Sequence, residues 1–251
     1  MASLQSARLE TFATGEEVAD AVAAWLLRLA LASKGRFSLN LSGGSTPKVL
    51  YGRLAQKPYA KDFPWGRTHL FFGDERFVPK DNKDSNFHMV SDALLSHVHI
   101  PDENVHRIVT EVPSAEAAAS RYEGELTRFY GADTLDPERP LFDVTLLGLG
   151  PDGHTASLLP GQPVLDERRR WVAAVEQGRP EKRITLTYPV LESSRHVAFL
   201  VVGQDKAAML AHIRSGATDV PAGRLDTPGE VLWFIDQAAV NTQGPVSPEL
   251  R

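Results

Sequence analysis

Three short segments of the sequence carry the side chains best suited to chemistry: Ser42–Pro47, Gly73–Arg76 and Gly148–Pro160. Each segment directly follows a run of apolar residues that is typical of a strand. Ligands of open α/β sheets bind beyond the carboxyl ends of the strands. We therefore expect the three segments to meet at one site.

The first segment predicts an anion-binding loop. Gly43 and Gly44 offer backbone N–H groups, and Ser45 and Thr46 offer hydroxyls. A helix is expected to begin at Pro47, with Thr46 as its N-cap, and a helix N-terminus preceded by glycines is suited to phosphate. A tight turn with an ordinary helix cap would have the same composition, so composition alone leaves both interpretations open. The spacing of a P-loop is absent.

The third segment contains Gly148-Leu-Gly-Pro-Asp-Gly153, which matches the Gly-x-Gly-x-x-Gly pattern of dinucleotide-binding proteins. In those proteins the pattern opens a long helix, and an acidic residue that binds the ribose follows about 20 residues later. Here Pro160 and Gly161 would end any helix early, and the nearest acids, Asp166 and Glu167, come too soon. We therefore expect no nicotinamide cofactor.

His154 is the strongest candidate for proton transfer. It follows the expected strand in a loop, two residues after Asp152 and next to Thr155. Imidazole gains and loses a proton near neutral pH, which suits general acid–base catalysis. A surface histidine without a role is the alternative, but the position of His154 at the mouth of the sheet favours the catalytic interpretation.

Several charged residues could hold an anion near these loops. Asp74, Glu75 and Arg76 follow a second expected strand, and Arg183 and Lys206 would add positive charge to a phosphate site. Solvated surface charge is the commoner role of a single lysine or arginine, so that alternative stays open.

The composition excludes several classes of protein. The 251 residues contain no cysteine, which excludes disulfides, thiolate metal sites and a cysteine nucleophile. His97, His99 and His106 lack the converging ligand set that zinc requires, so no metal is expected. The net charge of −5 argues against a broad nucleic-acid-binding surface. The longest apolar stretch, 21–32, is shorter than the ~20 residues that span a bilayer, and no secretory signal is visible. We expect a cytoplasmic protein.

Helical and strand patterns alternate along the chain. We expect helices over 16–34, from 47 onward, and over 87–98, 115–130 and 206–213. Strands are expected over 37–41, 70–72, 142–149, 172–175, 184–186, 197–202 and 231–235. This alternation predicts a three-layer α/β fold, with a mostly parallel, Rossmann-like sheet and helices on both faces. We expect one domain over residues 1–251, with a frayed C-terminal tail from about residue 243.

Together these segments resemble a known family, the 6-phosphogluconolactonases. The matching motifs occur in the family's order: Leu41–Pro47, Phe72–Arg76, Ser85-Asn86, Ile100-Pro101, Asn104–Arg107, Gly148–Pro160 and Arg183–Thr187. The resemblance implies a modified Rossmann-like sheet and hydrolysis of 6-phospho-D-glucono-1,5-lactone to 6-phosphogluconate, in the oxidative pentose phosphate pathway, without a cofactor. It also implies a small-molecule sugar-phosphate partner, neither nucleic acid nor membrane, and a monomer or small homo-oligomer.

The resemblance implies a role for each candidate residue. His154 would be the general base, and Asp74 or Asp152 would orient the imidazole or the water. Gly43, Gly44, Ser45 and Thr46 would bind the phosphate. Arg76, Arg183 and Lys206 would offset its charge.

Two alternatives within the same fold stay open at this point. Glucosamine-6-phosphate deaminase shares similar loops, but it follows its histidine with a Phe-Asn-Glu-Pro type stretch whose glutamate takes part in ring opening. Ser157-Leu-Leu-Pro160 stands in that place here and offers no carboxylate. A sensor that binds the sugar phosphate without turning it over is the second alternative, and the presence of His154 argues against it.

Overall fold

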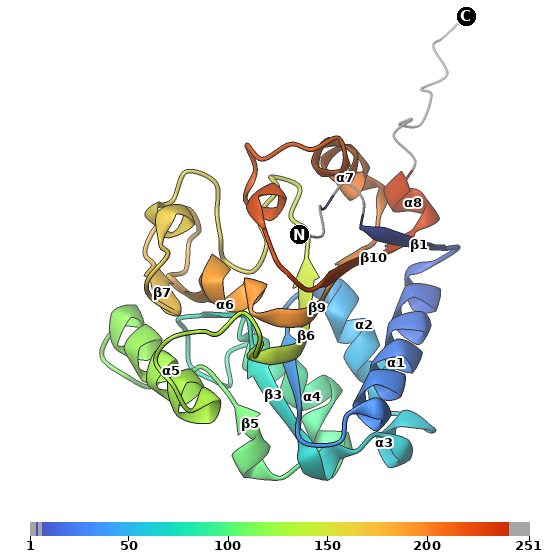
Figure 1. Cartoon of the computed structure of the whole chain (residues 1–251), viewed down its shortest axis with the longest axis horizontal. Helices are drawn as coiled ribbons and strands as arrows, with labels where there is room; N and C mark the ends of the chain where they lie inside the picture. The colour runs from blue at the N-terminus through green and yellow to red at the C-terminus, as the bar shows by residue number, and fades with distance from the viewer. Residues whose placement is uncertain (1–3, 5–6, 241–251) are drawn as a thin grey trace, which may run out of the picture.

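A computed structural model describes residue 4 and residues 7–240, and this part of the chain contains a seven-stranded parallel sheet (Figure 1). The strand order is β1-β10-β9-β6-β2-β3-β5, and every neighbouring pair is parallel. The strands are β1 (Arg8–Phe12), β2 (Phe37–Leu41), β3 (Thr68–Phe72), β5 (Val105–His106), β6 (Phe142–Gly148), β9 (Ser194–Val201) and β10 (Glu230–Asp236). Parallel strands covered on both faces are apolar along most of their length, which explains the continuous apolar run in β6.

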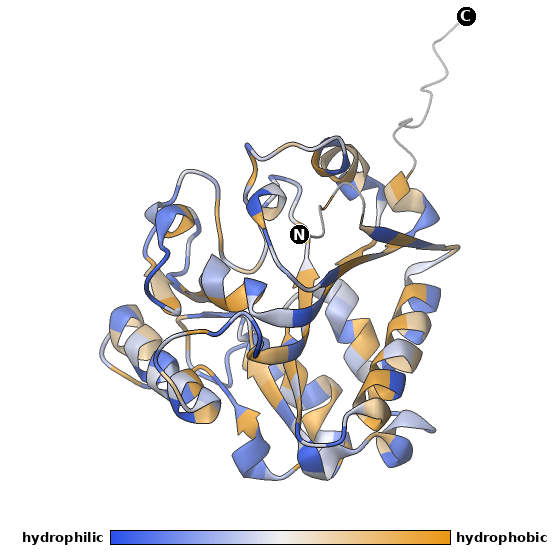
Figure 2. Cartoon of the chain, in the orientation of Figure 1, coloured by the Kyte–Doolittle hydropathy of each residue, from blue (hydrophilic) through white to orange (hydrophobic). Residues whose placement is uncertain are grey.

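Helices cover both faces of this sheet, as the sequence predicts. Figure 1 shows α1 and α2 on one side of the sheet and α5 and α6 on the other. The helices are α1 (Gly15–Ala32), α2 (Ser45–Leu54), α3 (Tyr59–Asp62), α4 (Asn86–Ala93), α5 (Ala115–Tyr130), α6 (Tyr188–Glu192), α7 (Ala207–Arg214) and α8 (Gln237–Val240). Apolar and hydrophilic residues alternate around α1 and α5, whereas the central strands are largely apolar (Figure 2). The three-layer α/β prediction is confirmed.

Local sequence explains where the longest helix begins and how it packs. The hydroxyl of Thr14 caps α1 by accepting a hydrogen bond from the N–H of Glu17 at 3.2 Å. Val18, Val22 and Leu26 follow helical spacing and are fully buried. Each such side chain stabilises the fold by about 1.5–3 kcal/mol through burial, and together they hold α1 against the sheet.

A second, antiparallel sheet lies beside the main one and was not foreseen. Its order is β4-β8-β7, and its strands are β4 (Asp74–Arg76), β7 (Val172–Val175) and β8 (Arg183–Leu186). The ranges expected for β7 and β8 were correct, but these strands do not join the main sheet. The residues Asp74–Arg76, which follow β3, form the strand β4, which the sequence analysis did not predict. The reason is that the carbonyl of Gly73 accepts a hydrogen bond from the N–H of Leu186 at 2.9 Å, which brings the chain directly from β3 into the second sheet.

Two helix boundaries and the two edge strands of the main sheet, β1 and β5, also differ from the sequence expectation. Helix α2 begins at Ser45 with Gly44 as its N-cap, at φ +103°, so the prediction of Thr46 as the N-cap was wrong. Helix α4 ends at Ala93 rather than at residue 98, because Leu94 leaves the helical region with φ −134° and a 3₁₀ turn follows. The edge strand β1 was not anticipated, since its alternation of polar residues with apolar ones is short and partly exposed.

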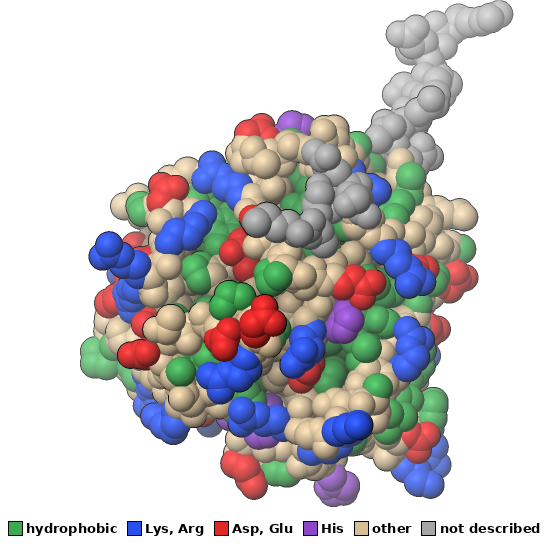
Figure 3. Space-filling view, viewed as in Figure 1, with side chains coloured by type: hydrophobic (Ala, Val, Ile, Leu, Met, Phe, Trp, Pro, Cys, Tyr) green, Lys and Arg blue, Asp and Glu red, His purple; other side chains and the backbone are tan. Residues whose placement is uncertain are grey.

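The remaining expectations concern membrane-spanning helices, the distribution of surface charge, the number of domains and the C-terminal tail. None of the helices in the described part of the chain is long and apolar enough to cross a membrane. Acidic and basic side chains are interspersed on the face shown in Figure 3. The single-domain organisation stays a prediction, and the tail from residue 243 lies outside the described residues.

Candidate active site

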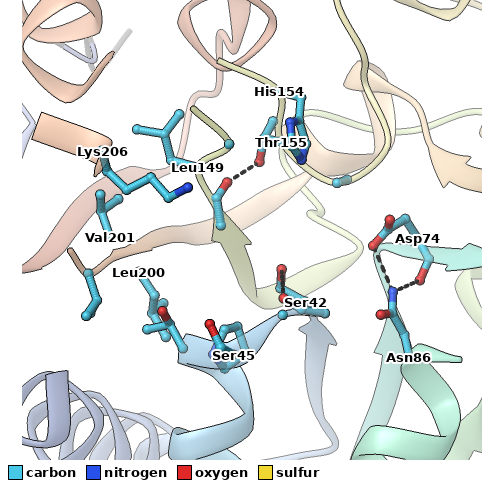
Figure 4. A pocket seen from close by; sticks show the side chains of 18 of the residues that line it. Ser42, Ser45, Asp74, Asn86, Leu149, His154, Thr155, Leu200, Val201 and Lys206 are labelled. Carbon is cyan, nitrogen blue, oxygen red and sulfur yellow. Dashed lines mark hydrogen bonds between the residues drawn. The ribbon is translucent and has the colours of Figure 1, made fainter. Parts of the chain in front are cut away.

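A pocket of about 230 Å³ opens at the carboxyl ends of the central strands (Figure 4). The loops after β2, β3 and β6 all contribute to it, as expected from their positions in the sequence. Nine of the ten predicted site residues line it: Gly43, Gly44, Ser45, Thr46, Asp74, Arg76, His154, Arg183 and Lys206. The tenth, Asp152, lies against the imidazole of His154. Three segments that are far apart in the sequence therefore form one site.

The glycine loop after β2 is held rigidly at the floor of the pocket. The buried hydroxyl of Tyr51 accepts a hydrogen bond from the N–H of Ser42 at 3.0 Å and donates one to its carbonyl at 2.7 Å. A Cβ at Gly43 would lie 2.1 Å from Oδ1 of Asn86, so only glycine fits there. The N–H groups of Ser45 and Thr46, at the start of α2, have no partner within the helix, whereas Pro47 has no N–H and Lys48 already donates to the carbonyl of Gly44. The first two N–H groups are therefore available to an anion in the pocket.

The glycines of the Gly148–Gly153 segment fold a tight turn that positions His154. The N–H of Gly150 donates to the carbonyl of His154 at 2.9 Å, and Gly153 has φ +78°. A Cβ at Gly150 would lie 2.0 Å from Nδ1 of His154, so the ring packs directly over this glycine. No helix opens at this turn, and the next helical turn in the described chain is the 3₁₀ segment Pro163–Asp166. The segment thus lacks the helix that a dinucleotide fingerprint requires.

Asp152 holds His154 in a defined orientation. One carboxylate oxygen of Asp152, Oδ1, is hydrogen-bonded to Nδ1 of His154, and the other, Oδ2, accepts from Nη2 of Arg179 at 2.7 Å. Since a carboxylate only accepts, Nδ1 carries the proton and the lone pair of the neutral ring lies on Nε2. Partial burial by itself would raise the pKa of Asp152, but the hydrogen bonds from Arg179 and His154 outweigh it and hold this pKa well below its usual range.

Asp74 occupies a different position from Asp152. It is 6% exposed, lines the pocket, and accepts hydrogen bonds from Oγ of Ser157 at 2.6 Å and from Nδ2 of Asn86 at 3.2 Å. Within the described residues no hydrogen bond joins Asp74 to His154. Of the two carboxylates considered from the sequence, Asp152 is the one that orients the imidazole. Asp74 faces the pocket instead.

Arg76 and Arg183 place two positive charges on one wall. They are directly paired in register across β4 and β8, and Nε of each is buried without a hydrogen-bond partner. The nearest carboxylate to Arg183 is that of Glu181, 3.9 Å away. Burial lowers the pKa of Arg183; the charge of Asp74 opposes this shift, and the charge of Arg76 adds to it. Two positive charges side by side on the wall of a pocket favour the binding of an anionic ligand there.

Lys206 is the third positively charged side chain that lines the pocket. Its side chain is only 21% exposed, and its Nζ lies 2.8 Å from Oδ2 of Asp205. Figure 4 shows Lys206 and Asp74 on opposite sides of the cavity. The pocket thus carries positive charge on two walls and a helix N-terminus between them.

The histidines considered as metal ligands do not converge. His106 is hydrogen-bonded to His69 at 3.0 Å and to Glu125 at 2.8 Å, whereas Nε2 of His97 lies 3.0 Å from the carbonyl of Asp92. Among residue 4 and residues 7–240, no group of three or more His, Cys, Asp or Glu side chains is arranged to hold a metal ion.

Comparison with known proteins identifies the family of this chain. Residues 13–233 match the sequence model of the family described as "Glucosamine-6-phosphate isomerases/6-phosphogluconolactonase". The chain belongs to this family. That match covers the three loops of the pocket, the second sheet, the helices from α1 to α7, and the main sheet apart from β1 and the end of β10.

Several known proteins are similar to this chain over most of its length. A protein named 6-phosphogluconolactonase 3, chloroplastic, from Arabidopsis thaliana is 42% identical over 82% of this chain and 65% of its own length. A protein named 6-phosphogluconolactonase from a Nostoc species is 40% identical over 85% of this chain and 87% of its own. A solved structure of 6-phosphogluconolactonase from Trypanosoma cruzi has a TM-score of 0.81 and 30% identity, over 95% of this chain and 97% of the other. This chain thus spans just under two thirds of the plant relative and most of the other two.

Polar residues that hold the two carboxylates of the site were missed by sequence analysis; Asn86, which lines the pocket and donates to Asp74, is one of them. Ser157 is fully buried and holds Asp74, and Arg179 holds Asp152. Ser157 lies inside the Gly148–Pro160 motif that resembles the 6-phosphogluconolactonases, so its position in that motif could have indicated a place in the site. Arg179 lies in a polar loop between β7 and β8, where an arginine carries no local signal of a partner 27 residues away.

Proposed function

We propose that the chain hydrolyses 6-phospho-D-glucono-1,5-lactone to 6-phosphogluconate, in the oxidative pentose phosphate pathway. The observation that carries the proposal is the Asp152–His154 pair on the rim of a pocket with positive walls. The names of the relatives at about 40% identity support the same activity. An oriented imidazole beside an anion site provides what a phosphorylated ester substrate needs.

The substrate phosphate binds at the N-terminus of α2. The N–H groups and hydroxyls of Ser45 and Thr46 contact it, with the backbone of Gly43 and Gly44 leaving room for its oxygens. Arg76, Arg183 and Lys206 offset its charge from the two walls of the pocket. Hydrogen bonds to charged groups are stronger than neutral ones, so this arrangement sets affinity for a sugar phosphate over a free sugar.

His154 activates water for attack on the lactone. Nε2 removes a proton as the water oxygen bonds to C1, which gives a tetrahedral oxyanion. The bond from C1 to the ring oxygen then breaks, and the ring oxygen takes the proton from Nε2. Asp152 keeps Nδ1 protonated through both steps, so the ring alternates between base and acid without turning. Such lactones also open without a catalyst, so positioning and one base, which contributes about 10²–10⁴-fold, carry the reaction.

The turn after His154 favours the lactonase over the deaminase activity of the same family. Leu158 and Leu159 are buried there, and Ser157 donates to Asp74, so the turn presents no carboxylate. Among the described residues that line the pocket, Asp74 is the one carboxylate. A ring-opening glutamate is therefore missing from its place.

Parallel assays test the proposal. Freshly made 6-phosphogluconolactone is hydrolysed with and without the protein while acid release is followed, and glucosamine 6-phosphate is assayed for ammonia. We expect lactone opening well above the spontaneous rate and no ammonia. Ammonia release would establish the deaminase instead, and binding of 6-phosphogluconate without turnover would establish the sensor. The cytoplasmic location and the monomeric or small homo-oligomeric state stay predictions.

A further inference from the structure

We propose that Arg179 is a positioning residue for His154 that acts through Asp152, and that it keeps the imidazole neutral at the pH where it serves as a base. The inference rests on the proposed lactonase function. No residue of the loop that carries Arg179, between β7 and β8, was among the site residues expected from the sequence. Arg179 does not line the pocket, whereas His154 does. Its effect on the reaction therefore passes through its neighbours.

Asp152 is shared between two cationic or potentially cationic groups. Its Oδ1 is bonded to the ring of His154, and its Oδ2 accepts from Nη2 of Arg179 at 2.7 Å. The same Nη2 lies 3.3 Å from Nδ1 of His154. Nη1 of Arg179 donates to the carbonyl of Gly178 at 2.9 Å, which ties the guanidinium to its own loop. The carboxylate is thereby fixed from the side opposite the ring.

This arrangement separates two effects of the carboxylate on the ring. A carboxylate next to imidazole orients it, but it also favours the protonated ring, which cannot act as a base. The guanidinium at 3.3 Å opposes protonation of the ring because both would be positive. Asp152 therefore supplies orientation while Arg179 offsets its charge. The partial exposure of all three side chains, 25–36%, limits the effect through solvent screening.

Other charged side chains lie near His154, and the effect of Arg179 must be distinguished from theirs. The groups that share the pocket or the loop are Asp74 and Arg76 of β4, Arg183 of β8, Lys206 before α7, and Glu181. On the remaining side, the loop of His154 meets apolar groups, since a Cβ at Gly153 would contact Val220 and Met209. Of the cations, Arg179 is the one in hydrogen-bond contact with Asp152 among the described residues.

The loop itself is packed so that Arg179 reaches Asp152. Gly178 has φ +89°, and a Cβ there would lie 3.2 Å from both Leu159 and Gln162. The loop therefore rests on the turn that follows His154. Lys182, further along the same loop, pairs with Glu176 at 2.5 Å and is 55% exposed. It is a matched control, because its removal deletes one positive charge from the same loop without touching Asp152.

The test compares Arg179→Met, Arg179→Gln, Arg179→Lys and Lys182→Met in the full chain. The pH dependence of kcat/KM is measured for each, and the ring of His154 is titrated by NMR, with His154→Gln used to assign its signals. We expect both neutral Arg179 variants to move the acid limb and the ring titration upward by about one pH unit. In Arg179→Lys, the acid limb and the ring titration should lie closer to their wild-type positions. KM should stay within about twofold of the wild type in the Arg179 variants. Lys182→Met should change neither the acid limb nor the ring titration.

Each contrary result has a distinct meaning. Unchanged ring titration in Arg179→Met and Arg179→Gln, or an equal shift in Lys182→Met, overturns the proposal. A raised KM with an unmoved acid limb places Arg179 on the substrate and also overturns it. Absence of lactone turnover by the wild type would remove the proposed function, but the ring titration would still decide the role of Arg179.

Discussion

Arg76 and Arg183 lie directly opposite each other on antiparallel strands, and both side chains face the same pocket. Like charges at opposed positions destabilise a sheet. The two strands are held together by the pairing of β8 with β7 and by the continuation of β3 into β4, and the charge of Asp74 lies close to Arg183. If the proposed anion site is correct, an anion in the pocket would relieve this repulsion and stabilise the fold.

The first prediction follows from this pair. Arg183→Met should raise KM for the lactone by roughly 10- to 100-fold, as expected for loss of a charged hydrogen bond, with a smaller change in kcat. Steady-state kinetics measure both constants. Arg195→Met is the control, since Arg195 pairs with Asp143 away from the pocket and its loss should leave KM unchanged. An unchanged KM in Arg183→Met would remove this residue from the phosphate site.

Replacement of His154 tests the base directly. His154→Gln should reduce kcat by about 10²–10⁴-fold, because the proposed base that takes the proton from water is lost. The circular dichroism spectrum and melting temperature should stay close to those of the wild type, since the ring is at the surface of the pocket. His99→Gln, at an exposed histidine, should have normal turnover. Near-normal turnover in His154→Gln would assign the base elsewhere.

Two glycine substitutions should have opposite effects. Gly43→Ala would bring a Cβ to 2.1 Å from Asn86, which is itself held by Asp74, so both stability and kcat/KM should fall. Gly52→Ala, within α2, meets nothing within 4 Å and should raise stability by about 0.5–1 kcal/mol with normal activity. Denaturant unfolding and lactone assays measure both. Equal stability of Gly43→Ala and the wild type would mean that the loop can move away from Asn86.

Stability should depend on pH through His69 and His106. Burial lowers the pKa of both, and each ring hydrogen-bonds the other at 3.0 Å. Since the folded pKa values are depressed, the unfolded chain binds more protons on acidification, so stability is present above about pH 6.5 and is lost as pH falls. His69→Phe removes one titrating ring while keeping the contact with Phe129.

The measurement for this prediction is the free energy of unfolding at about pH 7 and about pH 5. The loss between the two should be smaller in His69→Phe than in the wild type. His99→Gln serves as the control for removal of an exposed histidine and should lose as much as the wild type. An equal loss in all three proteins would show that other groups cause the acid sensitivity.

Local signals were sufficient for much of the fold. Helix α5 begins after Ser114 and ends before Gly131, as predicted, because a capping hydroxyl and a left-handed glycine mark its two ends. The continuous apolar run of β6 likewise required only the sequence. The convergence of the three loops also followed from sequence, since every parallel strand places its carboxyl end at the same edge.

The pairing of strands in the second sheet could not be predicted from the local sequence. Strands β7 and β8 have the apolar content of main-sheet strands, and the partner of each is decided by contacts far along the chain. The same applies to the choice between Asp74 and Asp152, and to Arg179. Only the folded turn at Gly150 shows which carboxylate meets the ring, and only the packing of the β7–β8 loop brings an arginine to it.

Gly73 has a consequence for how the pocket keeps its shape. Its N–H donates to the carbonyl of Leu41 and its own carbonyl accepts from Leu186, so one residue joins both sheets by main-chain bonds alone. A Cβ there would lie 3.2 Å from the carbonyl of Leu41. The spacing between the glycine loop after β2 and the strands that carry Arg76 and Arg183 is thus a property of the backbone. Sequence drift on the outer surface can proceed without altering the dimensions of the space in which the substrate lies.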